Sequence, residues 1–181
     1  MYLAVVLLLS ALKSEKALAR TDSLTGAVNR RFFHEVLQRE MDRSQRYRHP
    51  LTVAYLDLDN FKAINDQWGH PTGDKVLRTV VESAQKHLRS TDVIARLNGD
   101  EFAFLLPETG QQAAKSAVPK IQAALLQAMH RNAWPVTFST GVLTCLAPPT
   151  TVDEMMKSVD ELMYSAKRSG KNAIHYAIHA G

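Results

Sequence analysis

The sequence feature that most constrains the fold is an apolar run that ends in carboxylates. Residues 51–58 (LTVAYLDL) lie between His49-Pro50 and Asp59-Asn60. A short apolar run bounded by turn-forming residues predicts a buried strand, and a carboxylate at its end is costly unless a cation compensates it. In a strand, Asp57 and Asp59 project to the same side, which suits a hard divalent cation that prefers oxygen ligands. Alternatively, Asp59 or Asn60 only caps a short helix that begins at Phe61.

The rest of the chain alternates between helical and strand-like patterns. Apolar residues at helical spacing predict helices over residues 30–48, 72–88, 111–130 and 152–168. Short β-prone runs predict strands over residues 92–97, 102–106, 136–145 and 171–176. We expect Pro119 to kink or split the third of these helices. The alternation, with one central hairpin, predicts an α/β fold of the α+β sandwich type with a mixed sheet.

Length and composition predict one globular domain. The chain has 181 residues, of which 45% are hydrophobic and 22% charged, as in ordinary globular proteins. Its one cysteine, Cys145, excludes an internal disulfide framework and a cysteine-cluster zinc site. Because Cys145 lies in a predicted strand, we expect it to be buried and inert. The net charge of +4 favours anionic partners only weakly and argues against capture of a nucleic-acid polymer.

The amino-terminal segment differs from the rest of the chain. Met1 to Leu12 is apolar apart from one serine, and Lys13, Lys16 and Arg20 follow. A bilayer span needs about 20 apolar residues, so this run is too short to cross alone. It is either the cytoplasmic end of a transmembrane helix, with the basic residues inside, or an apolar helix that packs against another copy of the chain. We therefore divide the chain into a stalk or membrane-segment remnant, residues 1–20, and a domain, residues 21–181.

Three further clusters place polar side chains in turns. Asn98-Gly99-Asp100-Glu101 separates two predicted strands, and its adjacent acids repel each other unless a cation or water screens them. The alternative there is a solvated hairpin turn. Asn65 and Asp74 flank a loop with Gly and Pro and suit the edge of a purine; a carboxylate favours guanine because it accepts from N1–H and the exocyclic amine. The alternative for Asp74 is an acid in a first helical turn.

The last cluster, Lys167-Arg168-Ser169-Gly170-Lys171, is basic. It suits either a phosphate or merely the C-terminal dipole of a helix. Taken together and in order, the clusters resemble the GGDEF domain of diguanylate cyclases. The resemblance runs from Asp22 to Tyr176, and its matching strings are Asp22-Ser-Leu-Thr-Gly, Asn29-Arg-Arg, Asp57-Leu-Asp-Asn-Phe-Lys, Asn65-Asp, Gly69-His, Gly73-Asp74, Arg96-Leu-Asn-Gly-Asp-Glu-Phe102, Ala166-Lys and Gly170-Lys-Asn172.

The resemblance implies a nucleotide-cyclase or palm-like fold and a reaction that condenses two GTP molecules into cyclic di-GMP and two pyrophosphates. By similarity, Asp57, Asp100 and Glu101 are the catalytic residues. With the backbone carbonyl of Leu58 they would hold two Mg²⁺ ions, for which Mn²⁺ could substitute. Asn65 and Asp74 would bind guanine. The remaining expected substrate contacts come from Asn60, Phe61, Lys62, Asn98, Gly99, Lys167 and Lys171.

The resemblance also implies partners. Each domain would hold one GTP, so two domains must face each other as a homodimer, and the stalk would control that arrangement. Arg89-Ser90-Thr91-Asp92 matches the family's RxxD site, where the product cyclic di-GMP inhibits. A surface ion pair at a helix end is the alternative for these residues. The first interpretation of the amino terminus implies membrane attachment and a cytoplasmic domain at the inner face of the membrane.

Two residues depart from the family pattern. Asn98 stands where the family name has Gly, and Asn is the non-glycine residue that best tolerates positive φ. We expect Asn98-Gly99 to keep a type I′ turn, with slower turnover because of the added side chain. Lys171 replaces an Arg found in many relatives, which keeps the charge but loses bidentate binding. The alternative function is a catalytically degenerate domain that senses GTP or cyclic di-GMP.

Overall fold

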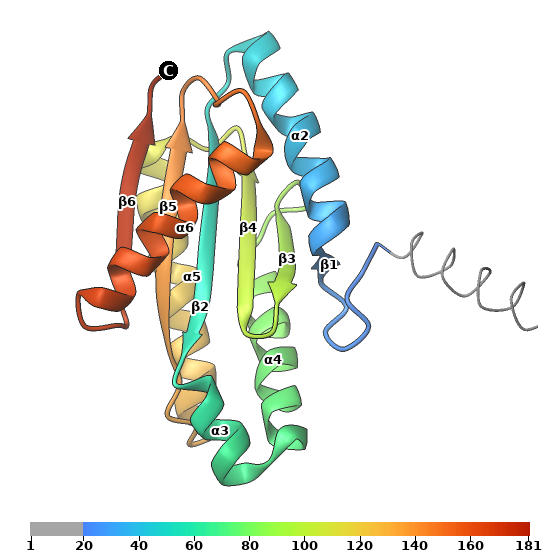
Figure 1. The fold of residues 1–181 in the computed structure, drawn as a ribbon, viewed down its shortest axis with the longest axis vertical. Coiled ribbons are helices and arrows are strands. Elements are labelled where there is room, and N and C mark those ends of the chain that lie inside the picture. Colours follow the sequence, from blue (N-terminus) through green and yellow to red (C-terminus); the bar gives the residue numbers. More distant parts are fainter. Residues whose placement is uncertain (1–19) are drawn as a thin grey trace, which may run out of the picture.

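A computed structural model describes residues 20–181 and contains a six-stranded mixed sheet covered on both faces by helices (Figure 1). The strand order is β1-β3-β4-β2-β5-β6. The outer pairs β1–β3 and β5–β6 are parallel, and the inner pairs are antiparallel. The mixed sheet predicted from the sequence is therefore confirmed. The strands are β1 Val28–Asn29, β2 Leu51–Asp59, β3 Val93–Asn98, β4 Glu101–Pro107, β5 Thr137–Cys145 and β6 Ile174–His179.

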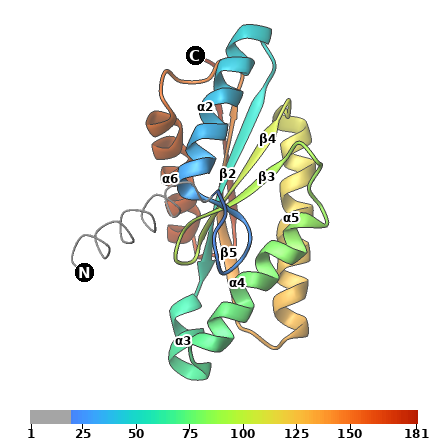
Figure 2. The ribbon, with the colours of Figure 1, turned by 90° about the vertical axis from the view of Figure 1, so that its right-hand side faces the viewer.

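The helices form two layers, one on each face of the sheet (Figure 2). Helices α2 and α6 contact one face, α4 and α5 contact the other, and α3 follows the end of β2. Both faces of the sheet are therefore buried, which explains why β2 is buried throughout and its apolar residues are not confined to alternate positions. The helix bounds are α2 Arg30–Tyr47, α3 Phe61–Trp68, α4 His70–Gln85, α5 Gln111–Arg131 and α6 Val152–Arg168.

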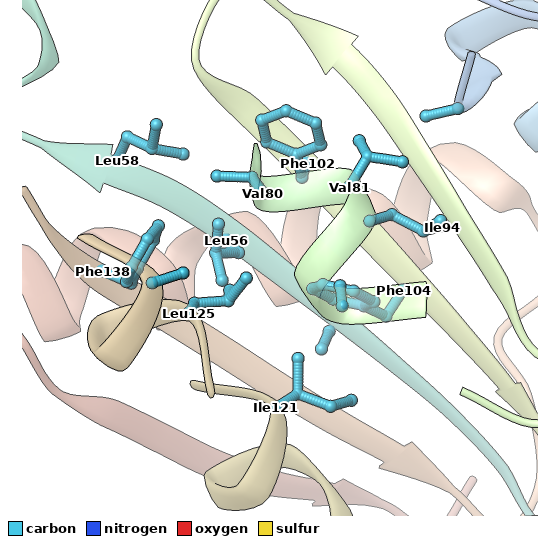
Figure 3. Packing of buried hydrophobic residues seen from close by; sticks show 14 of the residues in the cluster. Leu56, Leu58, Val80, Val81, Ile94, Phe102, Phe104, Ile121, Leu125 and Phe138 are labelled. Carbon is cyan, nitrogen blue, oxygen red and sulfur yellow. The ribbon is translucent and has the colours of Figure 1, made fainter. Parts of the chain in front are cut away.

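Each face of the sheet has its own apolar core. Leu56 of β2 packs with Phe102 and Phe138 on the side of α4 and α5 (Figure 3). Val53 and Tyr55 belong to the cluster on the side of α2 and α6. Because side chains alternate along a strand, Asp57 and Asp59 continue the α2 and α6 side at the end of β2. The fully buried central strand β2 thus places two carboxylates at its C-terminal end.

Four details differ from the sequence predictions. Helix α4 begins at His70 rather than residue 72 because Pro71 is compatible with a first helical turn. Helix α5 continues through Pro119 without splitting. Strand β6 begins at Ile174 because Gly170, Lys171 and Asn172 all have positive φ, which ends helix α6 in a left-handed loop. The two-residue strand β1 was not predicted.

The interpretations of Met1 to Leu12 and of most of the stalk lie outside the described residues. Within residues 20–181, no helix combines the length and the apolar composition that a membrane span requires.

Candidate active site

Strand register brings three carboxylates from two parts of the chain together. Strands β2 and β4 pair so that Asp57 lies opposite Glu101. The backbone N–H of Leu58 donates to the Asp100 carbonyl at 3.2 Å, which ties the tip of the β3–β4 hairpin to β2. The structure therefore places Asp57, Leu58, Asp100 and Glu101 side by side, and the assignment of these four residues to a metal site stays a prediction.

Asp57 is the most buried of these three carboxylates. Only 4% of it is exposed. Burial raises its pKa to about 6, the hydrogen bond with Lys167 opposes that rise, and the charges of Asp100 and Glu101 add to it. The Lys167 ammonium lies 2.7 Å from Asp57 Oδ2. Lys167 thus contacts the carboxylate directly, whereas the sequence analysis expected it at a phosphate.

The donor set suits a hard divalent cation. Within residues 20–181, no three His, Cys, Asp or Glu side chains already form a ligand cluster. However, Asp57 is a buried carboxylate beside two others, and the single Lys167 ammonium offsets only part of their negative charge. Carboxylate and backbone carbonyl oxygens are the ligands that Mg²⁺ prefers. The residues present therefore fit the metal that the family resemblance implies.

Asp59 has a different role from the one its spacing suggested. Its carboxylate accepts hydrogen bonds from the hydroxyls of Thr137 and Ser139, both at 2.8 Å, and from the Asn172 N–H at 3.1 Å. These bonds fasten the α6–β6 loop to the sheet. The idea that Asp57 and Asp59 together hold a cation is therefore corrected, because the Asp59 oxygens already accept these hydrogen bonds, whereas Asp57 lies beside the hairpin carboxylates.

The start of helix α3 lies beside the α6–β6 loop. Asn60 occupies the N-cap position with φ of 65° but makes no side-chain capping bond; its Oδ1 accepts from Lys171 Nζ at 2.9 Å. The predicted short helix beginning at Phe61 is therefore confirmed with Asn60 at its N-cap position, but the Asn60 side chain binds Lys171 rather than a helix N–H. The first N–H groups of a helix lack intrahelical acceptors, so those at Phe61 and Lys62 suit a phosphate beside the Lys171 ammonium.

Asn65 and Asp74 lie where α3 packs on α4. A Cβ at Gly73 would collide with the Asn65 side chain, so glycine is what allows Asn65 to lie against the first turns of α4. Asp74 follows directly and is half-buried. Because α4 starts at His70, Asp74 falls beyond its first turn, which removes the alternative role as a first-turn acid. The structure brings the two expected guanine-binding residues together.

The hairpin tip differs from the predicted turn. Asn98 pairs with Glu101 across the hairpin, so Gly99 and Asp100 form the turn. Of these tip residues only Gly99 has positive φ, at 24°. The expected type I′ turn centred on Asn98-Gly99 is wrong, because the register places Asn98 as the last residue of β3. Asn98 is exposed and needs no left-handed backbone.

The sequence patterns did not indicate that Arg96 and Asp22 hold the tip of the β3–β4 hairpin. Arg96 donates to the Gly99 carbonyl from Nε at 2.9 Å and from Nη2 at 2.7 Å. Its Nη1 lies 3.2 Å from Asp22 Oδ1, and the same oxygen accepts from the Thr25 N–H and hydroxyl. The turn at residues 22–26 is therefore linked to the hairpin through one guanidinium group. Asp22 and Arg96 both stand in the motif strings that carry the family resemblance, and this was the signal in the sequence that could have indicated them.

Tyr55 was also missed. Its hydroxyl donates to Glu101 Oε2 at 3.0 Å. Burial, followed by the neighbouring Glu101 charge, raises the pKa of this phenol, so it stays a proton donor at neutral pH. The strand pattern offered a signal, since Tyr55 precedes Asp57 by two residues and shares its face.

Arg89 and Asp92 form a closed turn between α4 and β3. The Arg89 N–H donates to Asp92 Oδ2 at 2.8 Å, and the Asp92 N–H donates to the Arg89 carbonyl at 3.0 Å. Within residues 20–181, Asp92 Oδ1 is the one buried side-chain N or O atom without a hydrogen-bond partner. Both residues line a pocket of about 380 Å³. The geometry contains no side-chain ion pair between them, contrary to the alternative interpretation.

Comparison with known proteins identifies the family. Residues 19–173 match the family model described as "Diguanylate cyclase, GGDEF domain". The chain belongs to this family. The resemblance and the fold expected from the sequence are thereby confirmed for this GGDEF domain.

Relatives of this GGDEF domain include proteins named as diguanylate cyclases. Diguanylate cyclase DgcP of Pseudomonas aeruginosa is 36% identical over 171 residues, covering 93% of this chain and 25% of that protein. The crystal structure of diguanylate cyclase SiaD with its activator SiaC, from Pseudomonas aeruginosa, has a TM-score of 0.81 and 32% identity, covering 96% of this chain and 68% of that one. The coiled coil and GGDEF domain of Caulobacter crescentus DgcB, in complex with c-di-GMP, has a TM-score of 0.79 and 26% identity, covering 97% and 95%. The chain spans a quarter to under half of the curated relatives' length.

Proposed function

We propose that this domain is a diguanylate cyclase, which condenses two GTP molecules into cyclic di-GMP with release of two pyrophosphates. The single observation that carries the proposal is the buried Asp57 carboxylate facing Asp100 and Glu101 across a strand pair. Family membership supports it, since named diguanylate cyclases align over most of the chain.

The carboxylates account for the metal dependence of such a reaction. Asp57, Asp100, Glu101 and the Leu58 carbonyl would hold two Mg²⁺ ions, or Mn²⁺ in their place. When bound, these ions supply Lewis-acid activation of the 3′-hydroxyl and neutralise charge on the attacked α-phosphate. The Lys167 ammonium lies 2.7 Å from Asp57 Oδ2, and it would bind a triphosphate oxygen instead once a cation compensates that carboxylate.

The other site residues would position the nucleotide. Asn65 and Asp74 would hold the guanine edge, and the Asp74 carboxylate would accept from N1–H and the exocyclic amine, donors that adenine does not offer together. The N–H groups at the start of α3, with Lys62 and Lys171, would bind the outer phosphates. This arrangement predicts a strong preference for GTP, and equal turnover of ATP and GTP would contradict it.

The reaction would require two copies of the domain. Each copy offers one guanine-binding pair, so a homodimer would bring each 3′-hydroxyl to the partner's α-phosphate. Product would bind at Arg89 and Asp92, where the unpartnered Asp92 Oδ1 can accept from guanine. The proposed setting is a cytoplasmic domain, with membrane attachment through a segment at or before the amino terminus.

Chromatography of the purified protein incubated with GTP and Mg²⁺ tests the proposal. We expect cyclic di-GMP and pyrophosphate from the wild type and none from Asp57→Asn or Asp100→Asn. Asp42→Asn is the control, because Asp42 is an exposed residue of α2 that accepts from Gln38 and belongs to no part of the candidate site. A folded wild type that binds cyclic di-GMP by calorimetry but makes none would instead support the sensor function.

A further inference from the structure

Tyr55 contacts the candidate metal site from within the sheet. It lies on β2, only 8% of it is exposed, and its ring belongs to the apolar cluster under α2 and α6. From this fixed position its hydroxyl donates to Glu101 Oε2 at 3.0 Å. The contact joins a rigid strand residue to a carboxylate at the base of a turn.

Glu101 has room to adopt another orientation. A pocket of about 440 Å³ opens beside it, and Tyr55, Arg30 and Lys157 are among the residues that line this pocket. Asp153 and Asp160 also line it, so a Glu101 carboxylate that rotates into the pocket meets cations and anions at several positions rather than one fixed partner. A hydrogen bond on one carboxylate oxygen opposes such a rotation and leaves the other oxygen for a cation.

We propose that Tyr55 is a positioning residue that holds the Glu101 carboxylate toward the divalent cation. The inference rests on the proposed function, because it assigns Tyr55 to the same metal site. Hydrogen-bond partners behind metal ligands fix ligand orientation, and their loss commonly weakens metal affinity by about tenfold or more. The Tyr55 hydroxyl makes such a contact to Glu101, and the sequence signature does not include it.

The substitution Tyr55→Phe removes one oxygen and keeps the ring in its core. Binding of Mn²⁺ is measured by electron paramagnetic resonance in the presence of a non-hydrolysable GTP analogue. We expect the dissociation constant for Mn²⁺ to rise about tenfold. The Mg²⁺ concentration for half-maximal activity rises by the same factor, whereas the KM for GTP at saturating Mg²⁺ is unchanged and excess Mg²⁺ restores kcat.

Tyr176→Phe is the matched control. Tyr176 is a half-buried strand residue on β6, with the Lys115 ammonium 5.9 Å from its ring centroid. It loses the same atom outside the metal site, so its Mn²⁺ affinity stays at the wild-type value. A reduction of activity in Tyr55→Phe that excess Mg²⁺ does not restore, with wild-type Mn²⁺ affinity, would overturn the inference.

The binding measurement separates this inference from the proposed function. A wild type that makes no cyclic di-GMP but binds Mn²⁺ with the analogue, and whose Tyr55→Phe variant binds Mn²⁺ more weakly, overturns the activity and supports the role of Tyr55. An active wild type whose Tyr55→Phe variant has unchanged Mn²⁺ affinity supports the activity and overturns the role of Tyr55. A wild type that binds no Mn²⁺ overturns both.

Discussion

Among single residues, Asp57 destabilises the metal-free fold although the proposed activity requires it. Burial raises its pKa to about 6, above the ordinary 3.8, so the ionised group destabilises the metal-free fold as the pH rises through 6. Lys167 is one-third exposed and can be solvated when its partner loses charge. We predict that Asp57→Asn abolishes activity yet raises the free energy of unfolding in EDTA at pH 7.5 by about 1 kcal/mol, or about 3 °C in Tm.

Asp59→Asn is the matched comparison, two positions along the same strand. Asp59 accepts three hydrogen bonds, and an amide can accept only through one of its two terminal atoms. Thermal unfolding of this variant should show a loss of about 2 kcal/mol. Equal shifts of the same sign in the two variants would contradict the different roles assigned to these carboxylates.

Cys145 gives a prediction about pH. Burial raises the pKa of its thiol to about 12 from the ordinary 9.0. The neutral thiol therefore stabilises the fold fully below pH 9, and that contribution is lost as the pH rises toward 12. Comparing the wild type with Cys145→Ala in denaturant, we expect the difference in unfolding free energy to be about 1 kcal/mol smaller at pH 10 than at pH 8. A difference independent of pH would show that the thiol ionises equally in both states.

Single-residue chemistry was largely predictable, whereas contacts were not. Carboxylates at the end of an apolar strand indicated a cation site because burying such charge is costly. The partners of Asp59 and the hydroxyl behind Glu101 depend on strand register, which a local pattern does not determine. Tyr55 and Glu101 are 46 positions apart.

For secondary-structure elements, the β3–β4 hairpin depends on one guanidinium group. Arg96 joins the Gly99 carbonyl to the Asp22 carboxylate. We predict that Arg96→Ala loosens the hairpin, lowers kcat about tenfold by misplacing Asp100, and leaves the KM for GTP unchanged. Hydrogen exchange of the hairpin amides measures the loosening.

Arg78→Ala is the control for that experiment. Arg78 is an exposed arginine that donates to the Leu24 carbonyl in the same amino-terminal turn, at 3.3 Å, but it does not contact the hairpin. Its loss should leave hairpin exchange and kcat at wild-type values. Unchanged exchange in Arg96→Ala would mean that strand pairing alone holds the tip.

Periodicity predicted most of the elements, with errors where backbone geometry decides. Strand β2 and helix α6 follow their patterns because both combine an apolar face with clear boundaries. The start of β6 was misplaced because three consecutive residues with positive φ, Gly170 to Asn172, carry no hydrophobic signal. The hairpin turn was misplaced by one residue, since an Asn-Gly pair is favoured at a turn centre but the strand pairing centres the turn on Gly99 and Asp100.

For the whole molecule, product feedback should depend on Asp92. Its Oδ1 is buried without a partner beside a pocket, so it can accept a guanine donor. We predict that Asp92→Ala abolishes cyclic di-GMP binding measured by calorimetry and leaves the initial rate unchanged, because the residue lies outside the metal site. Wild-type product affinity in this variant would contradict the assignment.

A crystal structure with Mg²⁺ and a non-hydrolysable GTP analogue would show whether the Asp57 and Asp100 carboxylates hold the metal beside the nucleotide. We predict a cation bound by Asp57 and Asp100, the guanine on Asn65 and Asp74, and the Lys167 ammonium moved from Asp57 to a phosphate. A bound nucleotide with no cation at these carboxylates, and with Lys167 still paired to Asp57, would contradict this prediction.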